Sequence, residues 1–327
     1  LESIYVGTIG KSHRTNDTSD MLMFNAEEAG IVVKFEKKDT PQKVNIKLFR
    51  QGPKDIRLND TKISQKELIG TLNTVIFCPE DLQLIKGTPS GRRRFLDMEI
   101  SQTSATYYHQ LMQYNRLLQQ RNVILKEYRG KQNIPLEEWD LQLADMASFI
   151  VKKRLESLKK INLLIDLMNR KLTGGLENLT IGYEQPYMDN GSLEYTKEGF
   201  YERIKAALPQ DRHRMTTSVG PHRDDLRFFS DAMDLKKFGS QGQQRTAVLS
   251  LKLSELEFIK SEVGEYPVLL LDDVLSELDE SRRANLLQFI HKRIQTFITT
   301  TDIHDFKDLK SVQFISCEGG KVQYGQP

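Results

Sequence analysis

The spacing of apolar residues in the first 80 positions predicts a short helix followed by strands. Four apolar residues with helical spacing open the chain: Leu1, Ile4, Tyr5 and Ile9. Residues 30–50 contain two apolar runs around a polar turn and predict two strands. A third apolar strand is expected at residues 72–78, and Pro79-Glu80-Asp81 is suited to begin a short helix after it.

The apolar period becomes helical from Arg92 to about Tyr128. One helix face is indicated by Tyr107, Leu111, Tyr114, Leu118 and Leu125. After a break at residues 130–135, a second long helix carries Val151, Leu155, Leu158, Ile165 and Leu172 on its seam, and Gly174-Gly175 ends it. Two long helices joined by a short connection predict an antiparallel helical hairpin.

An α/β pattern occupies the last third of the chain. A nearly all-apolar helix is expected at residues 247–259, a buried strand at 267–271, part of a helix at 286–290, and strands at 297–301 and 312–316. This alternation predicts a parallel sheet with helices on its faces. The fold class is therefore α/β, interrupted by a mostly helical lobe. We expect residues 1–90 and 211–327 to form one lobe and residues 91–210 the helical insertion.

The composition changes this picture little. Of the 327 residues, 38% are hydrophobic and 28% charged, as in a soluble globular protein with a sizeable core. No apolar run is long enough to span a membrane, and no signal peptide is visible. Because the chain opens on Leu1 within a predicted helix, we expect an upstream segment to be missing. Cys78 and Cys317 lie in apolar runs, so we expect buried, reduced thiols and a cytoplasmic location.

Basic residues gather locally, although the 47 basic and 45 acidic residues nearly balance. Most basic clusters are read as solvated helix faces. Arg92, Arg93 and Arg94 differ because they begin a helix, where the dipole disfavours positive charge. A DNA phosphate bound there would offset this unfavourable interaction between the arginines and the helix dipole. These three arginines are therefore the foremost DNA-facing candidates. Arg14 is a candidate for contacting nucleotide or DNA, with a plain surface arginine as the alternative.

Gly10-Lys11-Ser12 matches the end of a phosphate-binding P-loop, G-x-x-x-x-G-K-[ST]. The first glycine of that motif would fall at position 5, which is Tyr5. A side chain there would keep the backbone from wrapping phosphates, and no strand pattern precedes the stretch. We therefore expect this tripeptide not to be a P-loop.

The strongest chemical pattern is YPVLLLDDVLSELD, residues 266–279. An apolar run that ends in two carboxylates matches a Walker B strand, which is buried in a parallel sheet and delivers its last residues to a cleft. Asp272 is predicted to hold Mg²⁺ through an oxygen ligand. Asp273 is predicted to orient or deprotonate the attacking water. The alternative is a strand that ends in a polar turn.

A glycine-rich turn leads into the long apolar helix at KKFGSQGQQRTAVLSLKL, residues 236–253. A helix N-terminus offers free N–H groups and positive dipole to an anion. Ser240 and Gly242 are candidates to meet a terminal phosphate, with Gln243 adding side-chain donors. The alternative is an ordinary helix capped by Ser240.

Several stretches resemble a known family. Ser240-Gln241-Gly242-Gln243-Gln244 resembles the signature motif of ABC-type ATPases, and the stretch from Ser276 to Asp279 resembles their D-loop. More specific still are KSHRT at residues 11–15, PEDLQLIKGTPSGRRRFLD at 79–97 and GPHRDDL at 220–226. Together, in this order, they resemble the RecF family of bacterial recombination mediators.

This resemblance implies a specific mechanism. The family's P-loop would lie just upstream of Leu1, and the signature residues Ser240 to Gln243 would complete the ATP site of a second subunit. ATP and Mg²⁺ would then join two copies head to tail into an ATP-dependent homodimer. The implied function is binding of DNA, duplex next to single strand, and help with loading RecA alongside RecO and RecR.

The chain departs from most ABC ATPases at two positions. Asp273 stands where most carry glutamate, which fits slow, switch-like hydrolysis. The histidine usual after the next strand is not evident, and Thr301-Asp302 stands there, which leaves the sensor of the terminal phosphate open. The pattern around His222, Asp224 and Asp225 predicts a structural turn with an Arg–Asp pair, because three well-separated zinc ligands are lacking.

Other functions share some of these features. A transporter nucleotide-binding subunit would need a membrane partner, which the basic-ended helical insertion does not suit. A chromosome ATPase head of the SMC type would carry a far longer coiled coil. A non-enzymatic DNA clamp without a P-loop is the remaining alternative.

Overall fold

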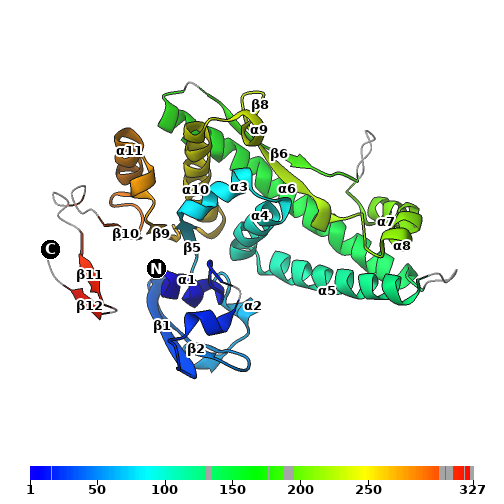
Figure 1. The fold of residues 1–327 in the computed structure, drawn as a ribbon, viewed down its shortest axis with the longest axis horizontal. Coiled ribbons are helices and arrows are strands. Elements are labelled where there is room, and N and C mark those ends of the chain that lie inside the picture. Colours follow the sequence, from blue (N-terminus) through cyan, green and yellow to red (C-terminus); the bar gives the residue numbers. More distant parts are fainter. Residues whose placement is uncertain are drawn as a thin grey trace.

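The computed structural model describes residues 1–15, 17–129, 135–175, 177–187, 195–301, 306, 312–319 and 321–324. Asp302 of the predicted sensor position lies outside these residues. A three-stranded parallel sheet lies at the centre, in the order β10-β9-β5. Its strands are β5 (Thr74–Phe77), β9 (Val268–Asp272) and β10 (Thr296–Thr299). The predicted strands at 72–78, 267–271 and 297–301 are confirmed, and distant parts of the chain meet in one sheet (Figure 1).

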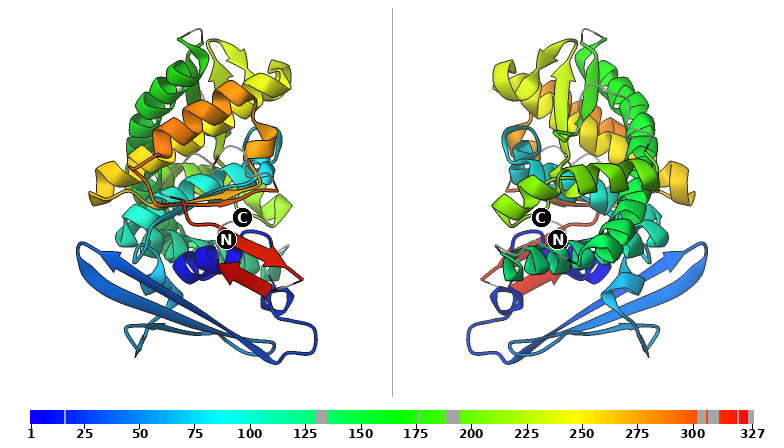
Figure 2. Two further views of the ribbon diagram at one scale, coloured as in Figure 1. Left: turned by 90° about the vertical axis from the view of Figure 1, so that its left-hand side faces the viewer. Right: turned by 90° about the vertical axis from the view of Figure 1, so that its right-hand side faces the viewer.

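The amino-terminal part forms a separate antiparallel sheet beside the helix α1 (Glu2–Ile9). Its strands are β1 (Glu28–Lys37), β2 (Thr40–Phe49), β3 (Asp55–Leu58) and β4 (Thr61–Lys62), with the short helices η1 (Thr18–Met21) and α2 (Gln65–Leu68) near them. Its own small core consists of Leu22, Val44, Ile46, Leu48, Ile56 and Leu68. The long β1–β2 hairpin extends at one end of the molecule in both side views (Figure 2). The predicted opening helix and the two strands within residues 30–50 are confirmed.

The expected single helix over residues 92–128 is wrong, because it is two helices. After η2 (Pro79–Leu82) and α3 (Gln83–Lys86) come α4 (Pro89–Thr103) and α5 (Ala105–Glu127). Ser104 lies between them with φ −144° and ψ 99°, and its hydroxyl accepts the Tyr107 N–H. An extended residue that caps the second helix cannot continue the first.

The predicted antiparallel hairpin is formed by α5 and α6 (Glu137–Thr173). Arg121 near the end of α5 pairs with Asp140 near the start of α6 at 2.6 Å. Tyr107, near the start of α5, contacts Arg154, which lies farther along α6. Gly174 ends α6 with φ 71°, as its sequence predicts. Over the described part of the chain, neither this 37-residue helix nor any other is apolar enough to cross a membrane.

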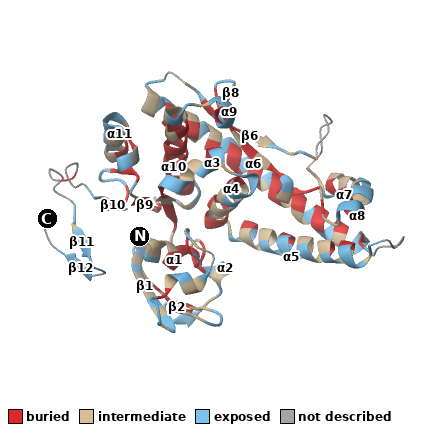
Figure 3. Cartoon of the chain, viewed as in Figure 1, coloured by how far each residue is buried: buried red, intermediate tan, exposed pale blue. Residues whose placement is uncertain are grey.

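The remaining elements complete the core around α10 (Gln241–Val263), which lies buried over most of its length (Figure 3). They are β6 (Leu179–Glu184), α7 (Lys197–Ala206), α8 (Leu208–Arg214), η3 (Pro221–Arg223), β7 (Asp225–Ser230), β8 (Met233–Asp234), α9 (Leu235–Phe238), η4 (Leu275–Glu277) and α11 (Glu280–Ile290). One hydrophobic core joins β5 and β9 with helices α4, α6 and α10. The division into lobes at residues 90 and 210 stays a prediction.

The last predicted strand is not part of the parallel sheet. It forms β11 (Ile315–Glu318), which pairs with β12 (Lys321–Tyr324) in a separate two-stranded hairpin. Every residue of both strands is exposed. The expectation of a buried Cys317 is therefore wrong, since its thiol lies on this hairpin, whereas Cys78 is buried as expected.

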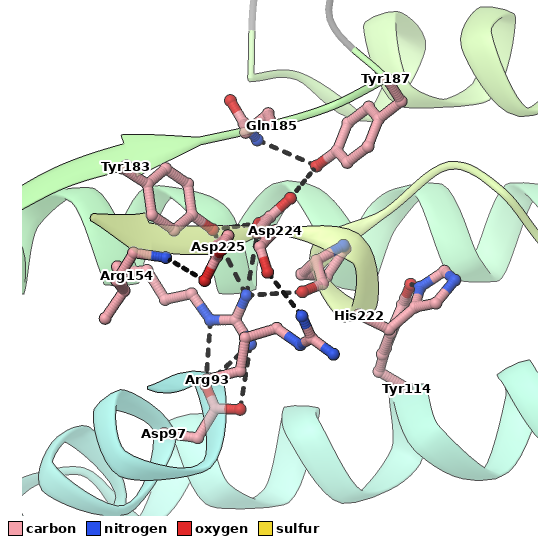
Figure 4. Close-up of polar contacts among 12 residues, drawn as sticks. Arg93, Asp97, Tyr114, Arg154, Tyr183, Gln185, Tyr187, His222, Asp224 and Asp225 are labelled. Atoms are coloured by element: carbon pink, nitrogen blue, oxygen red, sulfur yellow. Dashed lines mark hydrogen bonds and ion pairs between the residues drawn. The ribbon is translucent and has the colours of Figure 1, made fainter. Parts of the chain in front are cut away.

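A buried charge network ties α4, α6 and the turn before β7 together (Figure 4). The Arg154 guanidinium, only 2% exposed, donates to both carboxylate oxygens of Asp97 at 2.9 and 3.0 Å and to the Pro221 carbonyl at 2.7 Å. It also lies 3.3 Å from Asp224, whose carboxylate accepts the hydroxyls of Tyr183 and Tyr187. The predicted structural turn is present, but its aspartates pair with arginines from other helices, since Arg223 donates to the Thr217 carbonyl.

Replacing Arg154 with methionine is expected to lower the free energy of unfolding by about 3 to 5 kcal/mol, because the buried Asp224 and the partly buried Asp97 would lose their shared cation. Urea unfolding measures the change. The control is Arg170→Met on the same helix, where the arginine is 55% exposed and pairs with Asp166. Loss of that surface pair should cost less than about 1 kcal/mol. An equal cost for the two variants would contradict the structural role of Arg154.

Candidate nucleotide-binding edge

The carboxyl end of β9 presents the two consecutive aspartates that the sequence singles out. Asp272 is the last residue of β9 and lies in register with Thr299, the last residue of β10. The Thr299 hydroxyl donates to Asp272 Oδ1 at 2.8 Å and accepts the Asp273 N–H at 3.1 Å. One hydroxyl on the neighbouring strand therefore orients both aspartates.

Asp273 has a left-handed backbone, with φ 53°. Aspartate tolerates this conformation better than most side chains do, and such backbones concentrate at functional sites. The Asp273 carbonyl accepts the Ser276 hydroxyl at 2.8 Å, which stabilises the turn. The chain thereby leaves the strand direction abruptly, and Asp273 is exposed.

The segment Lys11–Thr15, here called the KSHRT loop, reaches the same edge from the other end of the chain. It follows Gly10, which ends α1 with φ 77°. The buried Ser12 hydroxyl donates to the Glu2 carboxylate and accepts the Arg14 N–H at 3.0 Å, so the loop folds back along α1. Gly10-Lys11-Ser12 thus follows a helix and not a strand, and the prediction that it is not a P-loop is confirmed.

The KSHRT loop places two basic side chains on Asp272. Arg14 Nη2 lies 2.5 Å from Asp272 Oδ2, and His13 Nε2 lies 4.0 Å from the same oxygen. Arg14 is 60% exposed, whereas the His13 side chain is 10% exposed. Arg14 therefore lies at the edge that carries Asp272, and its role toward nucleotide or DNA stays a prediction.

These neighbours determine the charge states. Burial acts to raise the pKa of Asp272, but the hydrogen bond from Thr299 and the Arg14 guanidinium outweigh it, and the pKa lies below its usual value. Burial and then Arg14 lower the pKa of His13. The edge therefore holds an ionised carboxylate beside a neutral imidazole at pH 7.

Asp272 fits the magnesium role, because an ionised carboxylate is a ligand that Mg²⁺ prefers. Within the described ranges, no group of three or more His, Cys, Asp and Glu side chains is arranged to hold a metal. An ion bound at Asp272 would complete its shell with water or substrate oxygens, as Mg²⁺ does at phosphate sites.

The signature-like residues form the N-terminus of α10. The Ser240 hydroxyl accepts the Gln243 N–H at 3.2 Å, and Gln243 Oε1 accepts the Ser240 N–H at 3.0 Å. This capping box confirms Ser240 as a helix cap. Gln243 also donates to Glu177 at 3.0 Å. Ser240 and Gln241 are exposed beside Gly242, so this helix end is open to a second molecule.

The D-loop-like residues follow β9 directly. Ser276 bonds to the Asp273 carbonyl, and Asp279 caps α11 by accepting the Arg282 N–H at 2.9 Å. Both residues are exposed. Among the hydrogen bonds of the described residues, Ser276 is linked to Asp273, and none links Ser276 or Asp279 to Ser240.

Comparison with known proteins identifies the family. The chain is 46% identical over 313 residues to the DNA replication and repair protein RecF of Alkaliphilus oremlandii (strain OhILAs), covering 95% of this chain and 85% of the relative. It is 45% identical over 323 residues to the protein of the same name from Clostridium botulinum (strain Eklund 17B / Type B), covering 98% and 88%. The chain belongs to the RecF family. No family model matches it.

Solved structures agree with this RecF assignment. The recombination mediator protein RecF-ATP in the RecFOR pathway has a TM-score of 0.91 and 34% identity, over 100% of this chain and 87% of that one. The SMC head bound to the C-winged helix domain of ScpA has a TM-score of 0.55 at 14% identity, which shows a shared fold alone. The predicted ABC-type ATPase head is confirmed as the fold class.

The proposed DNA-facing role of Arg92 is wrong. Arg92 is 3% exposed and forms two hydrogen bonds with the Asp225 carboxylate, at 2.7 and 2.8 Å. Arg93 is partly buried and donates to the Asp224 carbonyl at 2.6 Å. Only Arg94 is exposed, and it stays a candidate. The Asp225 carboxylate therefore balances the positive charge of Arg92 at the start of α4.

Sequence reasoning missed two residues of this RecF edge, Thr299 and His13. Thr299 is the last residue of the strand next to the Walker B strand. Its position at the strand end is the one signal by which the sequence could have indicated a contact with Asp272. His13 precedes Arg14 in the KSHRT stretch, which the sequence marks only by its resemblance to a family. The burial of the His13 side chain depends on how the loop folds, which the sequence pattern does not predict.

A wide cleft lies at the opposite end of the sheet. It has a volume of about 700 Å³ and lies between the β1–β2 hairpin and the residues that precede β5 and β9. Among its lining residues are Lys37, Thr71 and Pro267. It contains none of the predicted site residues, so its size does not mark the nucleotide site.

A second buried charge cluster joins α10 to η2 and α4. Lys252 Nζ lies 3.2 Å from Asp81 and 3.4 Å from Glu255. Burial raises the pKa of Glu99 to about 7, with Lys252 opposing and Asp81 adding to the shift. Burial likewise raises the pKa of Glu255. Three carboxyl groups around one ammonium thus favour the protonated forms of Glu99 and Glu255.

Replacing Glu99 with glutamine is expected to stabilise the protein more at pH 8 than at pH 5. The usual carboxyl value is 4.5 and the folded value about 7, so wild-type stability falls as pH rises between them. Glutamine does not titrate, and its advantage should grow by about 2 to 3 kcal/mol over this range. Urea unfolding at both pH values measures it. The exposed Glu28→Gln variant is the control, and parallel pH curves for wild type and Glu99→Gln would contradict the buried charge.

Proposed function

We propose that this chain is an ATP-dependent DNA-binding protein of recombinational repair, which dimerises when it binds ATP. The observation that carries the proposal is the Asp272–Asp273 pair at the end of β9, next to the KSHRT loop. Membership of the RecF family and the similarity to a RecF-ATP structure support it.

In this proposal, Asp272 holds Mg²⁺ against the phosphates of ATP, and the ion supplies charge stabilisation when bound. Asp273 orients or deprotonates the attacking water. Its left-handed turn projects it from the strand end, and its exposure leaves room for a water molecule. A short side chain in this role fits weak, switch-like hydrolysis.

The dimer is proposed to be head to tail. The exposed N-terminus of α10, with Ser240, Gln241, Gly242 and Gln243, would complete the ATP site of the partner copy. Ser276 and Asp279 lie exposed after the Walker B strand and would face the same interface. In this arrangement each ATP site would combine residues of both copies.

We propose that the ATP-bound dimer binds DNA at junctions of duplex and single strand, with Arg94 as one contact to phosphate. Functional partners would be RecR, RecO and RecA. The similar solved structure is described as a protein of the RecFOR pathway, which supports RecO and RecR as partners. Residues 1–90 and 211–327 would form the ATPase lobe, and residues 91–210 the helical lobe.

Ser240→Arg is expected to weaken ATP-driven dimerisation of the full-length protein at least about tenfold, because a bulky cation would occupy the interface. Nucleotide binding by the monomer should persist. Sedimentation velocity with and without ATP measures dimerisation, and DNA binding should fall with it. Ser64→Arg removes an equivalent capping-box serine at α2 and is the matched control. Undiminished dimerisation of Ser240→Arg would contradict the head-to-tail arrangement.

Asp273→Asn is expected to reduce ATP hydrolysis by roughly 10²-fold or more while preserving ATP-driven dimers, because asparagine cannot act as a base. Asparagine also tolerates the left-handed backbone, so the turn should survive. Phosphate release and dimer lifetime are the measurements. Asp231→Asn, at another exposed aspartate with φ 50°, is the control. Hydrolysis at the wild-type rate would exclude Asp273 as the base.

A further inference from the structure

His13 is a nearly buried imidazole without a hydrogen-bond partner. Both ring nitrogens are inaccessible to solvent, and neither has a partner among the described residues. A buried polar group left unpaired costs free energy, so native proteins almost always satisfy it. The arrangement therefore points to a partner other than the residues that the structure describes.

The surroundings indicate what kind of partner fits. His13 Nε2 lies 4.0 Å from Asp272 Oδ2, which is too far for a hydrogen bond. That oxygen already accepts Arg14 at 2.5 Å. The Tyr5 ring packs edge-on at 5.5 Å between ring centroids and holds the imidazole in place. An N–H donor beside a guanidinium and a magnesium-binding carboxylate matches a phosphate oxygen of a magnesium nucleotide.

The neighbouring strand does not offer an alternative donor of the same kind. Thr299 at the end of β10 is engaged with Asp272 and Asp273. The described residues that follow it, Thr300 and Thr301, carry no imidazole. The expected position for a histidine that senses the terminal phosphate is thus filled by hydroxyl side chains in the part of the chain that the structure describes.

We propose that His13 contacts the terminal phosphate of bound ATP and makes the site distinguish ATP from ADP. In this chain the sensing imidazole comes from the KSHRT loop, on the amino-terminal side of the sheet edge, and not from the segment after β10. The inference rests on the proposed function, since it requires a nucleotide at the Asp272 edge.

The imidazole would act by donating a ring N–H to a phosphate oxygen. ADP lacks that oxygen, so the ring would stay unpaired in the ADP complex. The Ser12–Glu2 hydrogen bond holds the loop against α1 and limits how far His13 moves. The ring is therefore held near the Asp272 edge before the nucleotide arrives, and a local rearrangement has to expose one ring nitrogen when the phosphate binds.

The test compares the affinities of the full-length protein for Mg-ATP and Mg-ADP by isothermal titration. His13→Leu removes the donor and keeps an apolar side chain against Tyr5, and His13→Gln restores an N–H donor. A hydrogen bond to a charged group is worth about tenfold or more in affinity. We expect His13→Leu to bind ATP about tenfold more weakly, with ADP affinity changed less than about twofold. His13→Gln should recover part of the preference.

Two controls separate this role from others. His291→Leu replaces an exposed histidine after α11 and should keep the wild-type ratio. His304→Leu replaces the histidine that follows β10 in the sequence, and it too should keep the ratio. Sedimentation velocity gives a second readout, because His13→Leu should need more ATP to dimerise. Thermal unfolding confirms that each variant is folded.

Several outcomes overturn the inference. An unchanged ATP-to-ADP ratio in His13→Leu excludes contact with the terminal phosphate, as expected if only a water molecule bonds to the ring. An equal loss of both affinities assigns His13 a structural role. Loss of the preference in His304→Leu but not in His13→Leu moves the sensor to the other segment. If the wild type binds neither nucleotide, the proposed function itself fails.

Discussion

The parallel pairing of β5 with β9 is the constraint on which the rest of the molecule depends. Val75 lies opposite Leu269, so an early and a late part of the chain share one sheet. Burial of β9 between two strands directs its carboxyl end, and with it Asp272, to one edge. The KSHRT loop reaches this edge because α1 packs near the same sheet. The ion pair between Arg14 and Asp272 therefore depends on this strand pairing.

Two buried charge networks link elements that are far apart in the sequence. Arg154 joins two helices to the turn before β7, and Lys252 joins α10 to α4 and η2. Ionic groups of this kind add little net stability compared with apolar packing, yet they disfavour alternative arrangements that would leave a charge unpaired. The first network consists of residues that precede α10 in the chain, whereas Lys252 belongs to α10 itself. Both networks involve α4, through Asp97 in the first and Glu99 in the second.

Much of the fold and part of the site follow from local sequence pattern. The apolar run before Asp272 predicts a buried strand with carboxylates at its end, because periodicity and strand direction are local properties. Ser104 escapes prediction, since its neighbours keep helical spacing on both sides. The sequence pattern cannot predict the burial of Arg92, because its partner Asp225 lies 133 positions away. The placement of His13 depends on a side-chain contact between Ser12 and Glu2, which no pattern of hydrophobicity records.

The left-handed backbone of Asp273 also limits which amino acids evolution can place there. At φ 53° a side chain with a bulkier first carbon pays a steric cost, whereas aspartate and asparagine form local hydrogen bonds that offset it. A glutamate would gain reach toward a water molecule but lose this compensation. The identity of the residue is therefore a compromise between backbone geometry and chemistry. A lineage that acquired faster turnover at this position would first have to reshape the turn that Thr299 and Ser276 hold.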